Sequence, residues 1–204
     1  MKNLSVKLFL LLSSLIFNAC SDQPPAFTPL SDNATILAFG DSLTAGNGAL
    51  VSQSYPAVLQ KLSNINVINA GISGEISANG LKRLPALLKK HQPELIIICH
   101  GGNDILRKIN LQKTKNNIIK MIHLAESYNT QVLLLAVPKP SLLVPPAKVY
   151  FEIAETTAVE LDAETMPATL KNKKLKSDTY HPNAAGYSYI AEQIFNRLND
   201  KGAF

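Results

Sequence analysis

The chain has 204 residues, of which 46% are hydrophobic and 17% charged, which suits one domain with a sizeable core and argues against disorder. The formal net charge is +5, but Lys2 and Lys7 fall in a segment that we expect to be removed. The 20 basic residues less these two, against 15 acidic residues, leave +3. So small an excess, with no basic stripe interleaved with aromatic residues, argues against a nucleic-acid partner.

Residues 1–19 are similar to a bacterial signal peptide of the lipoprotein type. Two lysines are followed by an apolar core from Leu8 to Phe17, and Cys20 comes directly after a small residue. An ordinary secretory signal with a nearby cysteine is the alternative. We expect an exported lipoprotein that a lipid anchor on Cys20 ties to the membrane, on the periplasmic face of the cell envelope. Ser21, rather than Asp, after the cysteine favours the outer membrane.

Residues 20–34 contain several prolines and polar residues, which predicts a tether ahead of a domain that spans residues 35–204. In that domain short apolar runs alternate with helical patterns. The expected strands cover residues 35–39, 66–70, 94–99 and 131–137, with a short one at 159–161. The expected helices cover residues 55–63, 78–91, 111–128, 147–157 and 182–198, and Pro85 should split the second helix or start a new piece of it. Strands that are apolar throughout favour a mostly parallel sheet covered on both faces, an α/β fold.

Ser42 stands at the end of the first expected strand, in Gly40-Asp41-Ser42-Leu43. Open α/β sheets place their chemistry at the carboxyl ends of their strands. Taken alone, the serine could be a helix cap, because Asp and Ser are ordinary residues before a helix. Residues farther along the chain favour a catalytic role over a capping role for this serine.

Three loops follow three successive expected strands and carry Ser42, Gly74 and Asn103, so they should meet at one edge of the sheet. A fourth segment carries Asp178 and His181, three residues apart, before the last helix. A serine nucleophile needs a base within hydrogen-bond reach, and the base needs a group that fixes its tautomer; Ser42, His181 and Asp178 can supply these roles. The backbone N–H groups of Ser42 and Gly74 and the side-chain amide of Asn103 are suitable oxyanion donors.

Four short blocks then resemble the SGNH/GDSL hydrolase family: Gly40-Asp41-Ser42-Leu43, the Ile-Ser-Gly that ends at Gly74, Gly102-Asn103-Asp104 and Asp178-x-x-His181. The surrounding sequence is most similar to the family's branch of periplasmic thioesterase/lysophospholipases and arylesterases. The resemblance covers about residues 35–200 and implies a flavodoxin-like three-layer α/β/α sandwich and serine hydrolysis without metal. One departure is His100, which stands before the Gly-Gly pair where an apolar residue is more usual.

We therefore expect a serine esterase that hydrolyses short acyl or aryl esters, lysophospholipids or acyl thioesters through an acyl-enzyme. Leu142, Leu143 and Val144 in a proline-rich loop offer an apolar flank to an acyl chain, and the absence of Trp disfavours a sugar substrate. A carbohydrate or cell-wall O-deacetylase of the same family is one alternative. An envelope binding module with a dead site is the other.

The sequence predicts no metal, no cofactor and no disulfide framework. Cys20 and Cys99 are the only cysteines, and Cys99 lies in an apolar run as a small buried residue would. No spacing typical of a metal site occurs. We expect a monomer whose partner is a small acyl-ester substrate.

Overall fold

A computed structural model describes residues 26–204 except residue 142. In that part of the chain five parallel strands form one sheet in the order β2-β1-β3-β4-β5. The strands are β1 (Thr35–Gly40), β2 (Asn66–Gly71), β3 (Leu95–Cys99), β4 (Gln131–Leu135) and β5 (Glu160–Asp162). This is the flavodoxin-like strand order, and it confirms the predicted α/β fold.

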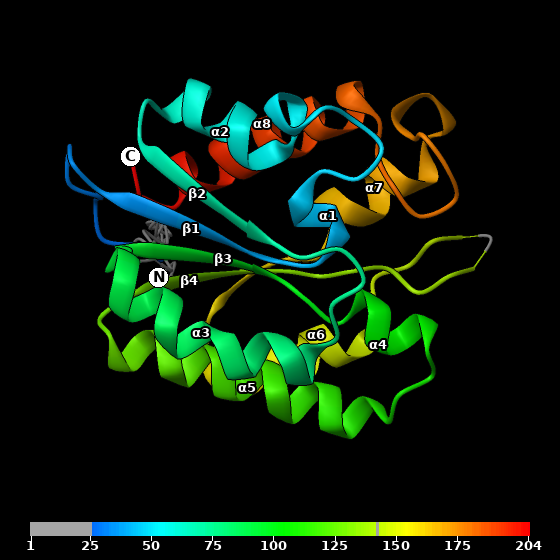
Figure 1. The fold of residues 1–204 in the computed structure, drawn as a ribbon, viewed down its shortest axis with the longest axis horizontal. Helices are drawn as coiled ribbons and strands as arrows, with labels where there is room; N and C mark the ends of the chain where they lie inside the picture. The colour runs from blue at the N-terminus through cyan, green and yellow to red at the C-terminus, as the bar shows by residue number, and fades with distance from the viewer. Residues whose placement is uncertain (1–25, 142) are drawn as a thin grey trace, which may run out of the picture.

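Helices cover both faces of the sheet (Figure 1). On one face lie α2 (Tyr55–Ser63), α7 (Thr165–Lys171) and α8 (Ala184–Asp200). On the other lie α3 (Ser77–His91), α5 (Leu111–Ser127) and α6 (Lys148–Thr157). Both layers are needed because every residue of β3 is fully buried and would otherwise expose apolar side chains on both of its faces. None of the helices in the described part of the chain has both the length and the hydrophobicity that a membrane span requires.

Two very short helices at the carboxyl ends of strands were not expected from the sequence. They are α1 (Ser42–Ala45), directly after β1, and α4 (Gly102–Leu106), directly after β3. The remaining elements are two 3₁₀ turns, η1 (Val51–Gln53) and η2 (Lys173–Leu175). Both short helices begin where the site residues lie, so they decide the direction of the backbone N–H groups there.

The predicted break in α3 at Pro85 is wrong. The helix runs from Ser77 to His91 without interruption, with Pro85 inside it. Proline removes one backbone hydrogen bond and normally kinks or ends a helix. Here Leu84 and Leu88, on either side of it, are fully buried in the core. Their packing holds the helix in one piece.

The predicted tether, residues 20–34, extends too far at its carboxyl end. Phe27 is only 3% exposed, and the chain from residue 26 onward packs against the domain. The backbone N–H of Phe27 donates to Lys201 O, and that of Leu30 donates to Ala203 O. Residues 26–34 therefore belong to the domain, while residues 20–25 and the expected signal peptide lie outside the described residues.

Candidate active site

Ser42 is the first residue of α1, directly after the buried strand β1. Asp41 caps this helix, because its Oδ1 accepts a hydrogen bond from Leu43 N at 3.1 Å. The N–H of Ser42 itself has no acceptor among the described residues, as expected for the first residue of a helix. It is free to face an anion, and the helix amino terminus favours negative charge there.

Asp178 and His181 lie in a tight loop whose base is closed by an isolated bridge between Lys176 and Pro182. Asp178 Oδ1 accepts from the backbone N–H of Tyr180 at 2.7 Å and of His181 at 2.9 Å. An aspartate commonly organises a turn in this way, through its own side chain. The loop therefore presents the second carboxylate oxygen, Oδ2, to the imidazole of His181.

The three side chains predicted as nucleophile, base and orienting group meet in one row. His181 Nδ1 lies 2.8 Å from Asp178 Oδ2, and His181 Nε2 lies 3.0 Å from Ser42 Oγ. With Nδ1–H donating to the carboxylate, the lone pair of Nε2 points at the serine hydroxyl. This arrangement can remove the proton of Ser42 as its oxygen attacks an electrophile.

The pKa values of Asp178 and Asp41 are shifted in opposite directions, and the two residues have different positions in the site. Burial raises the pKa of Asp178, but hydrogen bonds from the His181 side chain and from the backbone of Tyr180 and His181 outweigh it, so that the pKa falls below its ordinary value. A carboxylate that stays charged can stabilise an imidazolium. Burial raises the pKa of Asp41, and hydrogen bonds from Leu43 and Asn103 offset this only in part. Asp41 braces its loop and does not touch the base.

Gly74 and Asn103 reach the same place from the next two strands. Gly74 has φ +76°, a left-handed conformation that glycine adopts without strain, and its N–H has no acceptor among the described residues. Asn103 Nδ2 donates to Asp41 Oδ2 and to Glu75 O, each at 3.1 Å. Asn103 thus ties the nucleophile loop to the Gly74 loop. Its donation to an oxyanion stays a prediction.

A cleft of about 530 Å³ opens over this row of residues. Ser42, Gly74, Asn103 and His181 all line it. The proline-rich loop forms an apolar side, as expected, but with partly different residues: the cleft is lined there by Val137, Pro138, Pro140 and Val144. Leu143 is 72% exposed and is not part of the lining, and Leu142 lies outside the described residues.

His100 is fully buried and does not line the cleft. Its Nε2 lies 3.1 Å from Glu75 Oε2, so this histidine makes a hydrogen bond within the loops. Sequence reasoning missed two arginines that hold the Gly74 loop. Arg107 donates to Gly74 O at 2.8 Å, and Arg83 donates to the carboxylate of Glu75. Arg83 lies in α3 and Arg107 in the turn that follows α4, both next to a lysine as solvated residues often are, so no local signal marked them.

The model of the GDSL-like lipase/acylhydrolase family matches residues 38–189. The chain belongs to this family. It is 34% identical over 172 residues to thioesterase 1/protease 1/lysophospholipase L1 of Escherichia coli, covering 80% of this chain and 83% of that protein. It is 31% identical over 179 residues to an arylesterase of Vibrio mimicus, covering 80% of this chain and 87% of that protein.

The structural comparison agrees with the family assignment. The psychrotrophic esterase EstA of a Pseudoalteromonas species, in a structure inhibited by monoethylphosphonate, superposes with a TM-score of 0.75 at 27% identity. The match covers 82% of this chain and 98% of that one. As a member of the GDSL-like family with esterases among its relatives, the protein is a serine ester hydrolase. Among the described residues no group of three or more His, Cys, Asp or Glu side chains could hold a metal ion.

Proposed function

We propose that the protein cleaves carboxylic esters and thioesters of single acyl chains through a covalent acyl-Ser42. The observation that carries this is the continuous row from Asp178 through His181 to Ser42, with contacts of 2.8 and 3.0 Å. A histidine held so by a carboxylate turns an ordinary hydroxyl into a nucleophile. The row ends in an open cleft, where a substrate carbonyl can reach it.

The reaction follows from the positions of these groups. Ser42 Oγ attacks the carbonyl carbon while His181 Nε2 takes the hydroxyl proton, and the carbonyl oxygen becomes an oxyanion. The N–H groups of Ser42 and Gly74, with the amide of Asn103, donate to that oxygen. His181 then gives its proton to the leaving oxygen or sulfur, the bond to the leaving group breaks, and acyl-Ser42 remains. Water attacks in the same way, and the acid is released.

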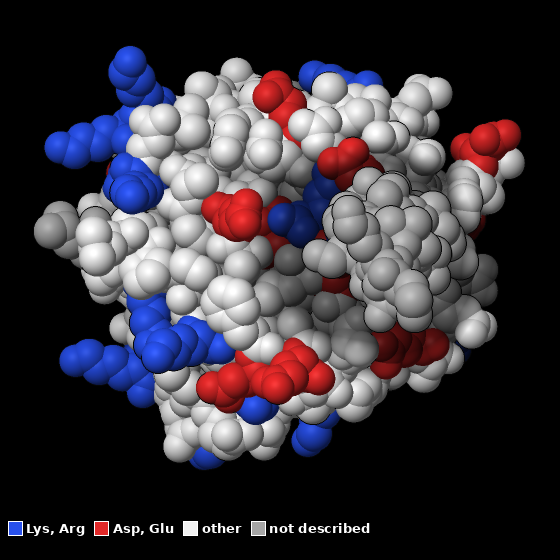
Figure 2. All heavy atoms as spheres, turned by 180° about the vertical axis from the view of Figure 1, so that it is seen from behind, with Lys and Arg blue, Asp and Glu red and all other residues white. Residues whose placement is uncertain are grey.

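The cleft lining supports an acyl chain joined to an anionic leaving group. Its walls are largely apolar, through Leu106, Val137 and Leu170, while Lys139 and Lys176 also line it. In Figure 2 many of the Lys and Arg side chains lie along the left edge of the molecule. This is the right edge in Figure 1, where the loops that follow the carboxyl ends of the strands lie. Lysine binds phosphate as a point charge. Lysophospholipids and acyl thioesters of phosphate-bearing carriers combine an acyl chain with such a group.

A carbohydrate or cell-wall O-deacetylase fits this lining less well. Tyr180, 47% exposed, is the one Phe, Tyr or Trp among the described lining residues, and a sugar ring needs a flat platform on which to stack. The remaining alternative, a binding module with a dead site, would have no need for a serine within 3.0 Å of an oriented imidazole.

Turnover of a substrate panel tests the proposal. The panel contains p-nitrophenyl acetate, butyrate and palmitate, a lysophospholipid, an acyl-CoA and acetylated xylan. We expect the wild type to hydrolyse the acyl esters and thioesters and Ser42→Ala to lose that activity with its fold intact. Hydrolysis that survives in Ser42→Ala contradicts the assignment of the nucleophile. Release of acetate from xylan alone favours the deacetylase.

We also propose that the protein is exported and anchored through an acylated Cys20 to the periplasmic face of the outer membrane. The signal-like residues 1–19 support this. The first described residues bond to Lys201 and Ala203, at the edge of the sheet opposite the cleft, so an anchor there would leave the cleft facing the aqueous space (Figure 1). Incorporation of an alkynyl fatty acid into wild type but not into Cys20→Ala is the expected result. Equal labelling, or none, contradicts it.

A further inference from the structure

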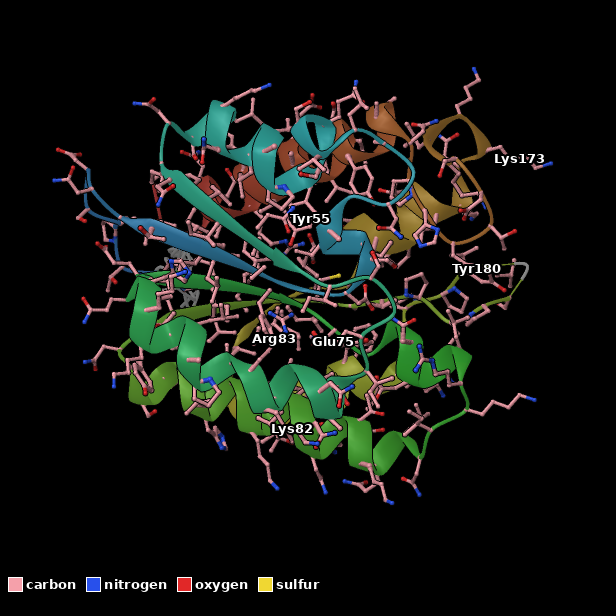
Figure 3. The ribbon with its side chains drawn as sticks, in the orientation of Figure 1. Tyr55, Glu75, Lys82, Arg83, Lys173 and Tyr180 are labelled. Atoms are coloured by element: carbon pink, nitrogen blue, oxygen red, sulfur yellow. The ribbon has the colours of Figure 1, made fainter. Side chains whose placement is uncertain are left out.

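A buried polar cluster lies behind the wall of the cleft and is not used in the reaction as written above. It consists of Glu75, Arg83 and His100. Glu75 directly follows Gly74, and its side chain is 7% exposed; Arg83 stands in α3 and is 22% exposed. His100 directly follows β3 and is fully buried. Figure 3 shows Arg83 and Glu75 side by side between α3 and the sheet.

The guanidinium of Arg83 joins two backbone carbonyls and one side-chain carboxylate. Its Nε lies 2.8 and 2.9 Å from the two oxygens of Glu75, and its Nη2 lies 2.6 Å from Glu75 Oε2. The same Nη2 donates to Ala70 O at 2.8 Å and to Gly40 O at 3.3 Å. Ala70 belongs to the end of β2, and Gly40 is two residues before Ser42. The guanidinium also lies 4.3 Å from the centre of the Phe39 ring, a cation–π distance.

His100 connects the third strand to the same carboxylate, because its Nε2 lies 3.1 Å from Glu75 Oε2. Helix α3 leaves room for this contact at Gly80, where a Cβ atom would lie 2.4 Å from His100 Nε2. The backbone O of His100 is held in turn by the hydroxyl of Tyr150 at 2.7 Å. Glu75 is therefore fixed from β1 and β2 through Arg83 and from β3 through His100.

We propose that Arg83 is a positioning residue for the hydrolysis: by joining Gly40 O, Ala70 O and the carboxylate of Glu75, it sets the separation of the Ser42 and Gly74 amides. The inference rests on the proposed function, since those amides matter only if an oxyanion forms between them. The two amides come from the ends of different strands, and donors aid a transition state only when both reach the same oxygen. A misplacement of about 1 Å can cost about 100-fold in rate.

Arginine suits this position better than lysine. Its guanidinium carries five N–H donors in a rigid fork, and here it serves a carboxylate and two carbonyls at once, which a lysine ammonium on a flexible stem cannot match. The charge of Glu75 is maintained as well. Burial raises the pKa of Glu75, but hydrogen bonds from His100 and Arg83 outweigh it and lower that pKa to about 2. Glu75 therefore stays ionised, and paired with Arg83, at any pH well above that value.

Stabilisation of the fold alone is the competing role, and Arg197 provides a matched control for it. Its side chain is 26% exposed, close to the value for Arg83. It lies 2.8 Å from Glu160 and 3.5 Å from Asp162, and it does not line the cleft. Arg197→Met therefore removes a similar arginine with similar ion pairs at a place that has no contact with the Gly74 loop.

The experiment compares Arg83→Lys, Arg83→Met and Arg197→Met with the wild type. Competent serine is counted by complete reaction with a fluorophosphonate, kcat and KM are measured with p-nitrophenyl butyrate, and the thermal midpoint reports stability. We expect Arg83→Met to lower kcat per competent serine by about 10- to 100-fold with KM changed by less than about 3-fold. Arg83→Lys should fall between it and the wild type. Arg197→Met should lower the thermal midpoint and leave kcat within about 2-fold.

If Arg83→Met does not fold, Arg83→Lys and Glu75→Gln decide the matter, because each keeps a polar side chain of similar size in place while removing part of the pairing between guanidinium and carboxylate. A kcat within about 2-fold of wild type in every folded variant overturns the inference. So does a loss of kcat that Arg197→Met reproduces. A wild-type protein that reacts with no ester or thioester would instead refute the proposed function, which keeps the two failures distinct.

Discussion

At the scale of single residues, the reactivity that we propose for Ser42 rests on two short contacts, His181 with Ser42 and His181 with Asp178, rather than on the hydroxyl alone. A serine hydroxyl is a weak nucleophile until a base accepts its proton. His181 is held for that purpose by Asp178, whose other oxygen organises the loop through two backbone N–H groups. One carboxylate thus shapes the loop and also orients the imidazole.

Asn103→Ala measures whether this side chain reaches the oxyanion or only braces the loops. If Asn103 donates to the oxyanion, kcat should fall by roughly 10²–10³, as when one donor of an oxyanion hole is removed. Its ground-state contacts with Asp41 and Glu75 predict some loss of stability as well. Steady-state kinetics on p-nitrophenyl butyrate, alongside a melting curve, separate the two effects. An unchanged kcat would restrict Asn103 to bracing.

The ion pair of Glu75 should appear in the pH dependence of stability. The pKa of Glu75 lies at about 2 in the folded protein, against an ordinary value of 4.5. A lowered pKa stabilises the fold above the ordinary value, and this contribution is lost as the pH falls from there to about 2. The difference in unfolding free energy between wild type and Glu75→Gln should therefore shrink over that range, as urea titrations can measure. A difference that stays constant with pH contradicts the ion pair.

At the scale of elements, the distance between nucleophile and base is set by two loops in close contact. Gly48, just after the nucleophile helix α1, has φ +96°. A Cβ atom there would lie 2.1 Å from Ser177 Oγ and 2.4 Å from Pro182 O, on either side of the Asp178–His181 segment. Only glycine allows the two loops to approach so closely.

Gly48→Ala should separate Ser42 from His181. The added methyl group must displace backbone, and the residue must also adopt a strained φ. We expect kcat to fall by about 10-fold or more, with a smaller relative effect on KM, while the core of the sheet stays intact by circular dichroism. Gly202→Ala, also at positive φ but near the carboxyl terminus, is the control. Equal activity in both variants would show that the loops tolerate displacement.

The long elements could be predicted from the sequence, and the short ones could not. The apolar runs of β1, β3 and β4 and the amphipathic pattern of α5 are set by burial, which repeats along the chain. Helices α1 and α4 span five residues or fewer, too few for any periodicity, and tertiary contacts such as that of Asn103 hold them in place. The continuity of α3 through Pro85 likewise depends on the packing of Leu84 and Leu88, and tertiary packing cannot be predicted from the local sequence.

The same distinction applies to the site. Ser42, Asp178 and His181 were predicted because their chemistry requires these residue types, and the structure brings them together. Arg83 was missed because its partners, Gly40 O, Ala70 O and Glu75, lie on three separate segments. In the sequence Leu-Lys-Arg-Leu it has the appearance of a solvated helical residue.

At the scale of the whole molecule, the domain begins before β1. Phe27 is buried against the core at the edge where residues 201–203 lie, away from the cleft. Phe27→Ala should lower the unfolding free energy by about 3 kcal/mol, as for other buried phenylalanines, because it leaves a cavity. Activity below the unfolding transition should not change. Urea unfolding and esterase assays measure both; unchanged stability would mean that residues 26–34 behave as a loose tether.

The parallel sheet explains how Ser42, Gly74 and Asn103 meet, since the loops after β1, β2 and β3 leave the same edge, and the segment before α8 brings His181, 139 positions from Ser42, to the same place. The central claim, an activated Ser42 at that edge, is tested most directly by intact-protein mass spectrometry after treatment with a fluorophosphonate. We predict one phosphonyl adduct on the wild type, located on Ser42. The adduct should be absent from Ser42→Ala, and its formation should be strongly slowed in His181→Ala. An unlabelled wild type, or equal labelling of Ser42→Ala, would contradict the account.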